Sequence, residues 1–396
     1  MEIGITCYPT YGGSGVLATE LGKALAERGH RVHFIAYALP QRLQHISERL
    51  VFHEVSMTPY PLFEFPYYAL ALTSKLVDVA RYEKLDILHM HYAIPHATSA
   101  VLARDILAES GIYLPVITTL HGTDITLVGQ DPSYAPVVTH SINRSDGVTA
   151  VSRFLKEETY RVFDVRRDIE VIPNFVDTRR FRRLNKEHFK RALCPNGEKV
   201  IVHVSNFRPL KRVLDIIRIF ARLHNQGIPA RLLLVGDGPD RLAAEQLART
   251  LGIYSHVSFL GKQEPVEEIL SIADVFLMTS ASETFGLAAL EAMACEVPVV
   301  SSNAGGLPEL VVDGETGFLC EVGDLDAFVA YTRRLLTDEA LHQRMAKAAR
   351  QHAVQTFDVQ RIVPLYEAYY QRICEQSTNK LSAVPCITDP SSNAIS

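Results

Sequence analysis

Apolar and polar positions along the chain follow two alternating patterns. Short, nearly continuous apolar runs such as ILHMHY and ARLLLVG are typical of strands that are buried on both faces. Longer segments such as VLATELGKALAERG and VLDIIRIFARLHNQG repeat apolar residues three and four positions apart, as amphipathic helices do. Because strand-like and helix-like segments alternate, the pattern predicts parallel sheets covered by helices on both faces.

The strand-like runs fall into two groups. EIGITCY, RVHFIAY, ILHMHY, PVITTLH, GVTAV and IEVIPN predict one sheet, and VIVHVSN, ARLLLVG, VSFLG, VFLMTS, PVVSS and GFLCE predict a second. A polar and basic stretch within residues 176–194 separates the groups and suits a linker with a short helix. The sequence therefore predicts an α/β protein with two Rossmann-like, doubly wound domains. Ligands of such sheets bind beyond the carboxyl ends of the strands, so the interdomain cleft is the expected site.

The expected boundaries follow from these groups. Residues 1–175 are expected to form the N-terminal domain, and residues 176–355 are expected to form the C-terminal domain. A helix at about 356–374 is expected to pack back on the N-terminal domain. Residues 375–396 are polar, contain Pro and Ser and lack periodicity, which predicts a disordered tail.

Composition narrows the class of protein. A chain of 396 residues is too long for one ordinary core, and a net charge of −5 gives no indication of nucleic-acid binding. The six cysteines lack metal-ligand spacing, which favours a reducing compartment. No signal peptide and no apolar run of about 20 residues is visible, so we expect a cytoplasmic protein without stable membrane insertion. Nothing in the composition excludes a homo-oligomer.

The stretch SETFGLAALEAMACEVPVV is the most informative in the chain. It places Glu283 and Glu291 with seven residues between them, among which are Phe285-Gly286-Leu287. We expect a helix to begin near Phe285 or Gly286, with Glu283 in the loop before it and Glu291 in its first or second turn. The free N–H groups of a helix N-terminus favour an anion such as a diphosphate, and nearby carboxylates accept hydrogen bonds from hydroxyl groups. The two glutamates therefore predict a nucleotide-sugar site; the simpler alternative is a helix whose early acidic residues suit its dipole.

Two further loops carry phosphate-binding chemistry. Ser205 and Asn206 end the strand VIVHVS and are followed by Arg208 and Lys211, whose charges can neutralise a departing nucleoside diphosphate. Their alternative is a solvated basic loop. In the N-terminal domain, the turn from Gly12 to Gly15 follows the first strand and precedes a helix. This turn is not G-x-G-x-x-G, so a dinucleotide site is disfavoured, and a simple tight turn is an equal alternative.

Polar residues gather where the N-terminal strands end. His89, His91, Tyr92 and His96 lie in LHMHYAIPHATSA, but no carboxylate or cysteine completes a metal-ligand set. We therefore expect no metal and place Tyr92 and His96 at the rim of the cleft. The only D-x-D, Asp324-Leu325-Asp326, lies where a helix is expected to begin and predicts a cap rather than a metal site.

Two more strand ends contribute polar groups to the same cleft. LHGTD places His121 beside Thr119 and Thr123, and Asn174 ends the strand before the linker. For His121 the alternative is a residue that only caps the backbone at a strand end.

In combination these motifs resemble the retaining glycosyltransferases of family 4, which have the GT-B fold. The resemblance covers the chain up to about Cys374 and rests on the E-x7-E string, the N-x-R-x-x-K loop, LLLVGDGP and GGLPEL. CYPTYGGSGV, LHMHYAIPHATSA, TTLHGTDIT and HVSNFRPLKR are more specific. They are similar to the members that transfer N-acetylglucosamine from UDP-N-acetylglucosamine to the hydroxyl of L-malate, with retention, in the first step of bacillithiol synthesis.

The resemblance implies the role of each candidate residue. The donor would be held by Gly15, Ser205, Asn206, Arg208, Lys211, Glu283, Phe285, Gly286, Leu287 and Glu291. Glu291 would bind the ribose hydroxyls and Glu283 a sugar hydroxyl. The acceptor would be surrounded by Ser14, Tyr92, Thr119, His121, Thr123 and Asn174. The residues expected to act in the transfer itself are His121, Arg208, Lys211 and Glu283, with no cofactor and no metal.

Two departures from the family pattern qualify the prediction. Glu296 stands where the family usually has glycine, and if that position requires a positive φ, glutamate there costs of order 1 kcal/mol. Malate also brings two carboxylates that need cationic partners, for which His140 and Arg144 are the candidates in the following helix.

Three alternatives remain open on sequence grounds. One is a family 4 enzyme with a lipid or polysaccharide acceptor, for which the aromatic stretch at 60–72 can line a groove or contact a membrane. A second is a non-catalytic protein that binds a nucleotide-sugar. The third, an epimerase acting on the same donor, needs acid and base carboxylates near the sugar ring that the sequence does not place.

Overall fold

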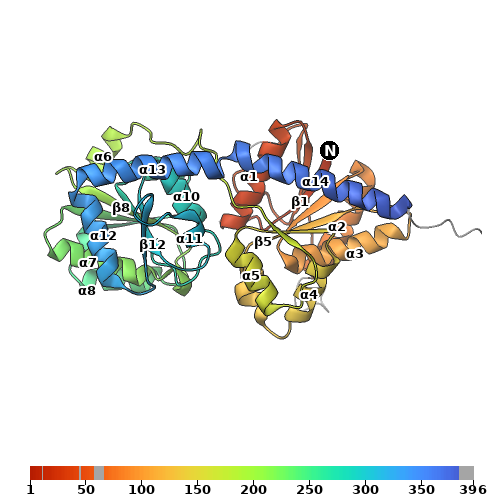
Figure 1. Ribbon diagram of the computed structural model, residues 1–396, viewed down its shortest axis with the longest axis horizontal. Coiled ribbons are helices and arrows are strands. Elements are labelled where there is room, and N and C mark those ends of the chain that lie inside the picture. The colour runs from red at the N-terminus through yellow and green to blue at the C-terminus, as the bar shows by residue number, and fades with distance from the viewer. Residues whose placement is uncertain (11, 44–45, 58–66, 383–396) are drawn as a thin grey trace, which may run out of the picture.

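The protein consists of two lobes, each built around one sheet of parallel strands (Figure 1). The computed structural model describes residues 1–10, 12–43, 46–57 and 67–382. In spatial order the first sheet contains β3 (Leu50–Glu54), β2 (Arg31–Ala36), β1 (Glu2–Thr6), β4 (Ile87–His91), β5 (Val116–Leu120), β6 (Gly147–Ala150) and β7 (Ile169–Val171). The second contains β10 (Val257–Gly261), β9 (Ala230–Val235), β8 (Lys199–Val204), β11 (Val275–Met278), β12 (Val299–Ser302) and β13 (Gly317–Cys320).

Helices connect the strands and cover both faces of each sheet. The first lobe contains α1 (Gly13–Glu27), α2 (Tyr68–Glu83), α3 (Thr98–Ala108), α4 (Ala135–Arg144) and α5 (Arg153–Val162). The second contains α6 (Glu187–Leu193), α7 (Val213–Asn225), α8 (Arg241–Thr250), α9 (Val266–Leu270), α10 (Leu287–Ala294), α11 (Leu307–Leu310), α12 (Leu325–Thr337) and α13 (Glu339–Phe357). Among the described residues, no helix combines the length and apolarity needed to cross a membrane.

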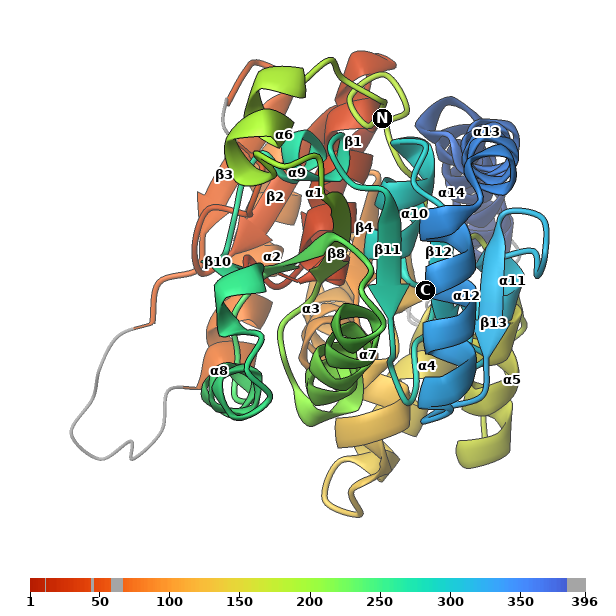
Figure 2. The same cartoon turned by 90° about the vertical axis from the view of Figure 1, so that its left-hand side faces the viewer.

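The second sheet shows why continuous apolar runs form its strands. On β8, Val200 and Val202 belong to the core shared with α10 and α13, whereas Ile201 belongs to the core shared with α7 and α12. Successive side chains of a strand point to opposite faces, so a strand between two helical layers must be apolar at every position. Figure 2, viewed from the end of this lobe, shows α7 and α12 on one side of the strands. The expected GT-B arrangement of two doubly wound domains is thereby confirmed at the level of architecture.

One strand, β3, is missing from the sequence prediction. It pairs in parallel with β2 at the edge of the first sheet, with Phe34 opposite Phe52 and Ala36 opposite Glu54. Its side chains are half-buried or exposed, and it includes His53 as well as Glu54. An edge strand that is covered on few sides does not need a continuous apolar run, so the pattern used for the inner strands does not detect it.

The C-terminal helices join the lobes. α13 lies on the second lobe, and α14 (Val359–Ser382) crosses to the first, where it runs along the outside (Figure 1). Its Tyr366 and Tyr370 are fully buried in one core with Ile3 and Ile5 of β1. The crossing is tied to the linker, because Val176 donates its N–H to the carbonyl of Phe357 and accepts one from Val359.

The expected end of ordered structure at Cys374 is wrong. α14 continues to Ser382, and Ser377 is buried, with its hydroxyl donating to the carbonyl of Ile373. The polar composition after Cys374 concealed this continuation, because a helix that packs on one side needs few apolar residues. The remainder of the expected tail, 383–396, lies outside the described residues.

Candidate functional site

The carboxyl ends of both sheets meet at the boundary between the lobes. Each sheet reverses its winding direction at one pair of strands, β1 and β4 in the first and β8 and β11 in the second. Doubly wound sheets bind ligands beside that pair, because the loops leave in opposite directions and open a crevice. The two crevices are in contact here: the Thr284 hydroxyl donates to the carbonyl of His121 at 2.7 Å.

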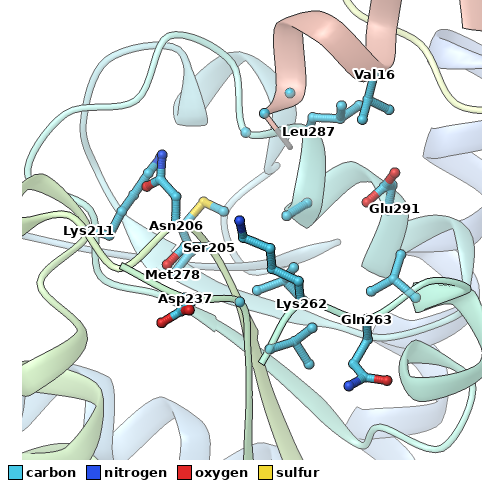
Figure 3. Close-up of a pocket in the computed structure, with 18 of the residues that line it drawn as sticks. Val16, Ser205, Asn206, Lys211, Asp237, Lys262, Gln263, Met278, Leu287 and Glu291 are labelled. Atoms are coloured by element: carbon cyan, nitrogen blue, oxygen red, sulfur yellow. The ribbon is translucent and has the colours of Figure 1, made fainter. Parts of the chain in front are cut away.

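Two adjoining cavities occupy this boundary. The first, which we term the C-terminal cavity, is lined among others by Arg42, Ser205, Lys211, Gln263, Glu264 and Glu291 (Figure 3). The second, the N-terminal cavity, has a volume of about 870 Å³ and is lined among others by Ser14, Tyr92, His121, Thr123, Asn174 and Arg208. Asn206, Glu283, Gly286 and Leu287 border both. A ligand in one cavity therefore lies next to a ligand in the other.

The loop before α10 has the geometry expected from its sequence. α10 begins at Leu287 after Gly286, whose φ of +100° falls in the left-handed region that glycine tolerates. Glu283 precedes the helix, and Glu291 lies in its second turn with 6% of its surface exposed. Burial raises the pKa of Glu291, while the charge of Arg42 opposes that shift. The two carboxylates thus lie on either side of a helix N-terminus that faces the C-terminal cavity.

The two cations expected to act together are separated. Lys211 lines the C-terminal cavity, where its ammonium forms an ion pair with Glu283 at 2.5 Å. Arg208 is exposed and lines the N-terminal cavity. A proline at position 209 begins a single helical turn between them, so their side chains project from different ends of that turn. Both remain beside Glu283, which borders the two cavities.

Ser205 and Asn206 are presented by the end of β8. The Ser205 hydroxyl lies 2.7 Å from Nε2 of the buried His203 and accepts the N–H of Phe207. Burial lowers the pKa of His203 to about 4, which keeps its ring neutral near pH 7. The side-chain oxygen of Asn206 is buried without a hydrogen-bond partner in the described part of the protein. A buried amide without a partner is unfavourable unless a ligand supplies one.

The N-terminal cavity brings together residues from four separate parts of the sequence. The hydroxyls of Ser14, on α1, and Tyr92, after β4, lie 2.8 Å apart. Tyr92 has a φ of +99°, an uncommon backbone conformation for a bulky residue, and such positions cluster at functional sites. Thr123 and Asn174 line the same cavity, and the side-chain oxygen of Asn174 has no partner among the described residues.

A chain of buried histidines supports this cavity from behind. Nε2 of His121 lies 2.8 Å from Nδ1 of His91, whose ring stacks on that of His121 and lies 4.4 Å from the ring of His89. Burial lowers the pKa of His121 to about 3, so the ring is neutral at pH 7. A neutral imidazole donates or accepts a hydrogen bond but carries no charge for a ligand carboxylate. His121 therefore supplies polarity to the cavity and no positive charge.

Several predicted residues lie away from the cavity surfaces. Gly15 lies within α1, and a β-carbon on it would come within 2.3 Å of the carbonyl oxygen of Tyr8, so its role is close packing. Thr119 is fully buried and bonds to His89 and Thr149. Among the candidates for the malate carboxylates, His140 is exposed and lines neither cavity, and Arg144 pairs with Asp105 at 3.3 Å.

The sequence did not point to several residues that line the cavities. Arg42 and Glu264 reach the C-terminal cavity from loops far apart in the chain, and Tyr8 and Asp124 line the N-terminal cavity. Asp124 was detectable, since it lies in the LHGTD motif. Its carboxylate accepts the N–H groups of Ala93 and Gly122, and burial raises its pKa to about 6. Arg42 had no local signal, because only folding brings it to Glu291.

The remaining polar predictions concern caps and metal ligands. Asp324 accepts the N–H of Ala327 at the start of α12, as a cap does. Outside the cleft, the described residues contain one group of three side chains with metal-ligand atoms close together, namely His33, His53 and Glu83. Arg31 already donates to the Glu83 carboxylate at 3.1 Å.

Comparisons with known proteins agree with this geometry. Residues 11–180 match the family model described as Glycosyltransferase Family 4, and residues 185–352 match the one described as glycosyl transferases group 1. The chain is 45% identical over 380 residues to the N-acetyl-alpha-D-glucosaminyl L-malate synthase of Bacillus anthracis, covering 96% of this chain and 99% of that protein. It is 29% identical over 282 residues to a glycogen synthase of Mycobacterium tuberculosis, covering 68% and 66%.

Solved structures show the same fold at low identity. The Anabaena protein HepE in complex with UDP and glucose has a TM-score of 0.77 at 22% identity, covering 97% of this chain and all of that one. A glycosyltransferase from Rickettsia africae has a TM-score of 0.76 at 20% identity, covering 94% and 98%.

Proposed function

This chain belongs to glycosyltransferase family 4, and we propose that it transfers N-acetylglucosamine from UDP-N-acetylglucosamine to the hydroxyl of L-malate. The observation that carries the proposal is the 45% identity to the L-malate synthase of Bacillus anthracis over nearly the full length of both chains. Under this proposal the reaction is the first step of bacillithiol synthesis. Residues 1–175 bind the acceptor and residues 176–355 bind the donor.

The nucleotide is bound in the C-terminal cavity. The buried Glu291 carboxylate accepts hydrogen bonds from the two ribose hydroxyls, and the N–H groups at the start of α10 face the diphosphate. The Lys211 ammonium donates one hydrogen bond to the Glu283 carboxylate. Its two other N–H groups can donate hydrogen bonds to the diphosphate oxygens. Glu283, which borders both cavities, is thereby held where a sugar hydroxyl can donate to it.

Malate is bound in the N-terminal cavity. Among the described residues that line this cavity, Arg208 is the only arginine or lysine. We therefore assign Arg208 to a malate carboxylate. A guanidinium binds a carboxylate through two parallel hydrogen bonds. Ser14, Tyr92, Thr123 and Asn174 supply neutral hydrogen-bonding groups, and Asn174 gains a partner for its oxygen. His121 stays neutral and orients the acceptor without repelling Arg208.

The transfer occurs where the cavities adjoin. The bond between the anomeric carbon and the diphosphate oxygen breaks, and a bond to the malate hydroxyl oxygen forms on the same face of the sugar. The hydroxyl proton passes to the departing diphosphate, which leaves as UDP. Lys211 and the α10 N-terminus stabilise the charge that develops on that leaving group. Attack on the same face retains the anomeric configuration and requires no enzymic nucleophile.

The activity is tested by measuring UDP release from UDP-N-acetylglucosamine with and without L-malate. We expect release that depends on L-malate, and a product whose anomeric proton has the small coupling of an α-glycoside by NMR. Release only with a different acceptor would refute the acceptor assignment. Donor binding without release with any acceptor would favour a non-catalytic binding protein, and a β-linked product would refute retention.

An acceptor with an apolar part is the second candidate. Val128, Tyr134 and Val137 line the N-terminal cavity and are exposed, which suits a lipid or a larger glycoside. The aromatic stretch that first suggested such an acceptor falls largely on 58–66, outside the described residues. In a competition assay, a lipid acceptor that inhibits malate transfer more strongly than malate analogues would favour this candidate.

A further inference from the structure

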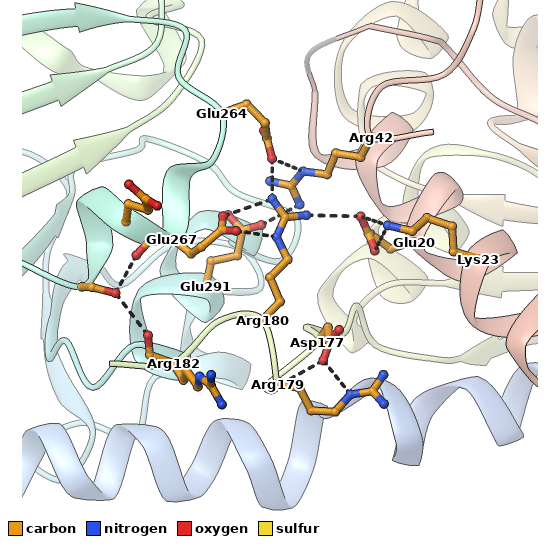
Figure 4. A network of polar contacts seen from close by, with 12 residues as sticks. Glu20, Lys23, Arg42, Asp177, Arg179, Arg180, Arg182, Glu264, Glu267 and Glu291 are labelled. Carbon is orange, nitrogen blue, oxygen red and sulfur yellow. Dashed lines mark hydrogen bonds and ion pairs between the residues drawn. The ribbon is translucent and has the colours of Figure 1, made fainter. Parts of the chain in front are cut away.

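Arg42 crosses the boundary between the lobes to reach the C-terminal cavity. It follows β2 in the first lobe, yet its guanidinium lies 3.2 Å from Oε1 of Glu291 and 3.1 Å from Oε1 of Glu264, both in the second lobe (Figure 4). It also lies over the ring of Phe181, 5.6 Å from the centroid. The Arg42 side chain is 9% exposed, so protein groups rather than water surround the guanidinium.

The backbone of Arg42 is itself constrained. Its φ of +67° lies in the left-handed region, which residues with a β-carbon rarely adopt. Such a conformation persists only where the surrounding contacts determine it, and these positions cluster at ligand sites. The contacts that hold Arg42 come from the opposite lobe and the linker. The turn at Arg42 is closed locally by the N–H of Leu43, which donates to the carbonyl of Pro40, and it directs the side chain to the opposite lobe.

Glu291 depends on a cation to act as an acceptor. A carboxylate accepts through both oxygens, whereas a protonated carboxyl group presents one hydroxyl that competes as a donor. Burial favours the protonated form and raises the pKa of Glu291, and Arg42 is the largest influence in the opposite direction. Without Arg42, the carboxylate would be buried in a cavity with its closest charge partner removed.

We propose that Arg42 is a positioning residue for the sugar nucleotide, which holds the Glu291 carboxylate ionised and oriented toward the cavity from the opposite lobe. Donor affinity then depends on a residue of the opposite lobe, because that residue is the ion-pair partner of the ribose-binding carboxylate. This inference rests on the proposed function, in which Glu291 binds the ribose.

A neighbouring arginine gives a matched comparison. Arg180, in the linker, pairs with Glu267 at 2.8 Å and with Glu264 at 2.5 Å, and it reaches Glu20 on α1 at 3.6 Å (Figure 4). It also spans the two lobes, but its ion-pair partners among the described residues are Glu20, Glu264 and Glu267 and do not include Glu291. Among the described residues, the charged or titratable groups around Glu291 include Arg42, Arg180, Glu264, Glu267, Glu20, Asp177 and Cys295, and the same cavity is also lined by Lys211, Asp237, Lys262 and Glu283. Substituting Arg180 therefore removes ion pairs between the lobes without removing an ion pair of Glu291.

The test measures binding of UDP-N-acetylglucosamine by calorimetry from pH 5 to 8. In Arg42→Met we expect the dissociation constant to rise roughly ten- to hundredfold, with a smaller change in kcat at saturating donor. The loss of affinity on acidification should begin at a higher pH than in the wild type, because the pKa of Glu291 rises when Arg42 is absent. Arg42→Lys, which keeps the charge but loses the planar fork, should show an intermediate effect.

Controls separate this role from simple stabilisation. Arg180→Met should lower the melting temperature. It should raise the pH at which donor affinity begins to fall on acidification by less than Arg42→Met does. In Glu291→Gln the pH dependence should disappear, and adding Arg42→Met should then weaken binding little further. Wild-type donor affinity across the pH range in both Arg42 variants would overturn the inference. Wild-type affinity in Glu291→Gln would instead overturn the donor site of the proposed function.

Discussion

The loop before α10 and the strand ends of β4 and β5 face each other across the cleft, but they handle charge in opposite ways. Around α10 the functional groups are ionised and paired, as in Lys211 with Glu283 and Arg42 with Glu291. Behind β4 and β5 the buried histidines are neutral, because burial lowers the pKa of His121 and His89 to about 3. The ion-paired side suits the diphosphate of the donor, whereas on the acceptor side the histidines add hydrogen-bonding groups and leave the charge to Arg208 and Asp124.

This contrast has a physical basis. Ion pairs buried at a cavity remain favourable only when each charge keeps a partner, so the donor side needs its complete set of residues. Neutral hydrogen-bond networks tolerate the loss of one member at a lower cost. Substitutions on the α10 side should therefore have larger effects than substitutions on the histidine side, and they should act on a different substrate.

The largest effect is expected from Glu291→Ala. The substitution removes both proposed ribose contacts and leaves Arg42 with Glu264 alone as an ion-pair partner, so the dissociation constant for UDP-N-acetylglucosamine should rise about a hundredfold. Isothermal calorimetry with the donor measures this directly. Glu267→Ala is the control, because Glu267 pairs with Arg180 in the same network and does not line the cavity. Equal losses in both variants would mean that the network, and not the ribose contact, determines affinity.

Arg208→Met tests whether the two cations serve different substrates. We expect the KM for L-malate to rise roughly ten- to hundredfold, since a charged hydrogen bond to a carboxylate is lost. The dissociation constant for the donor should change little. Arg212→Met is the matched control, because Arg212 pairs with Asp215 at 2.6 Å and lines neither cavity. If the dissociation constant for the donor rises and the KM for malate does not change, Arg208 binds the diphosphate of the donor, as first expected, and not malate.

His121→Asn probes the neutral side of the cleft. We expect kcat to fall about tenfold with donor affinity unchanged, because one neutral hydrogen bond that orients the acceptor is lost. A group with a pKa of about 3 stays neutral from pH 5 to 8, so the wild-type rate should show no step from His121 in that range. The exposed His140→Asn serves as control. Unchanged turnover in His121→Asn would contradict a role in the cleft.

The smallest effect is expected away from both cavities. Glu296 has a φ of +61°, in the region where glutamate is strained, as the departure from the family's glycine suggested. Glu296→Gly should raise the free energy of unfolding by about 0.5–1 kcal/mol without changing either KM. Glu296→Ala keeps the β-carbon and should give no such gain. Thermal unfolding of the three proteins distinguishes strain from the loss of the charge.

The two sides of the cleft also differed in how far they could be predicted. Glu283, Gly286 and Glu291 belong to one continuous string, so a helix start and its flanking carboxylates were visible locally, and the structure confirms that α10 begins at Leu287 after Gly286. On the other side, Thr119 faced the cleft in the prediction but is buried behind it with His89. Alternation along a strand gives the face of a side chain, but not whether another element covers that face, as Tyr366 and Tyr370 of α14 do beside His89.

The sequence by itself determined the family, the two parallel sheets and the loops that end their strands. These depend on short-range patterns, because apolar continuity, turn residues and helix starts are set within a few positions of the chain. Only the tertiary structure decided which cation faces which cavity, that α14 continues past Cys374, and that Arg42 meets Glu291. Arg42 and Glu291 are 249 positions apart and Lys211 and Glu283 are 72 apart, and the energies of such contacts depend on burial and on the partners that packing supplies, which no local pattern records.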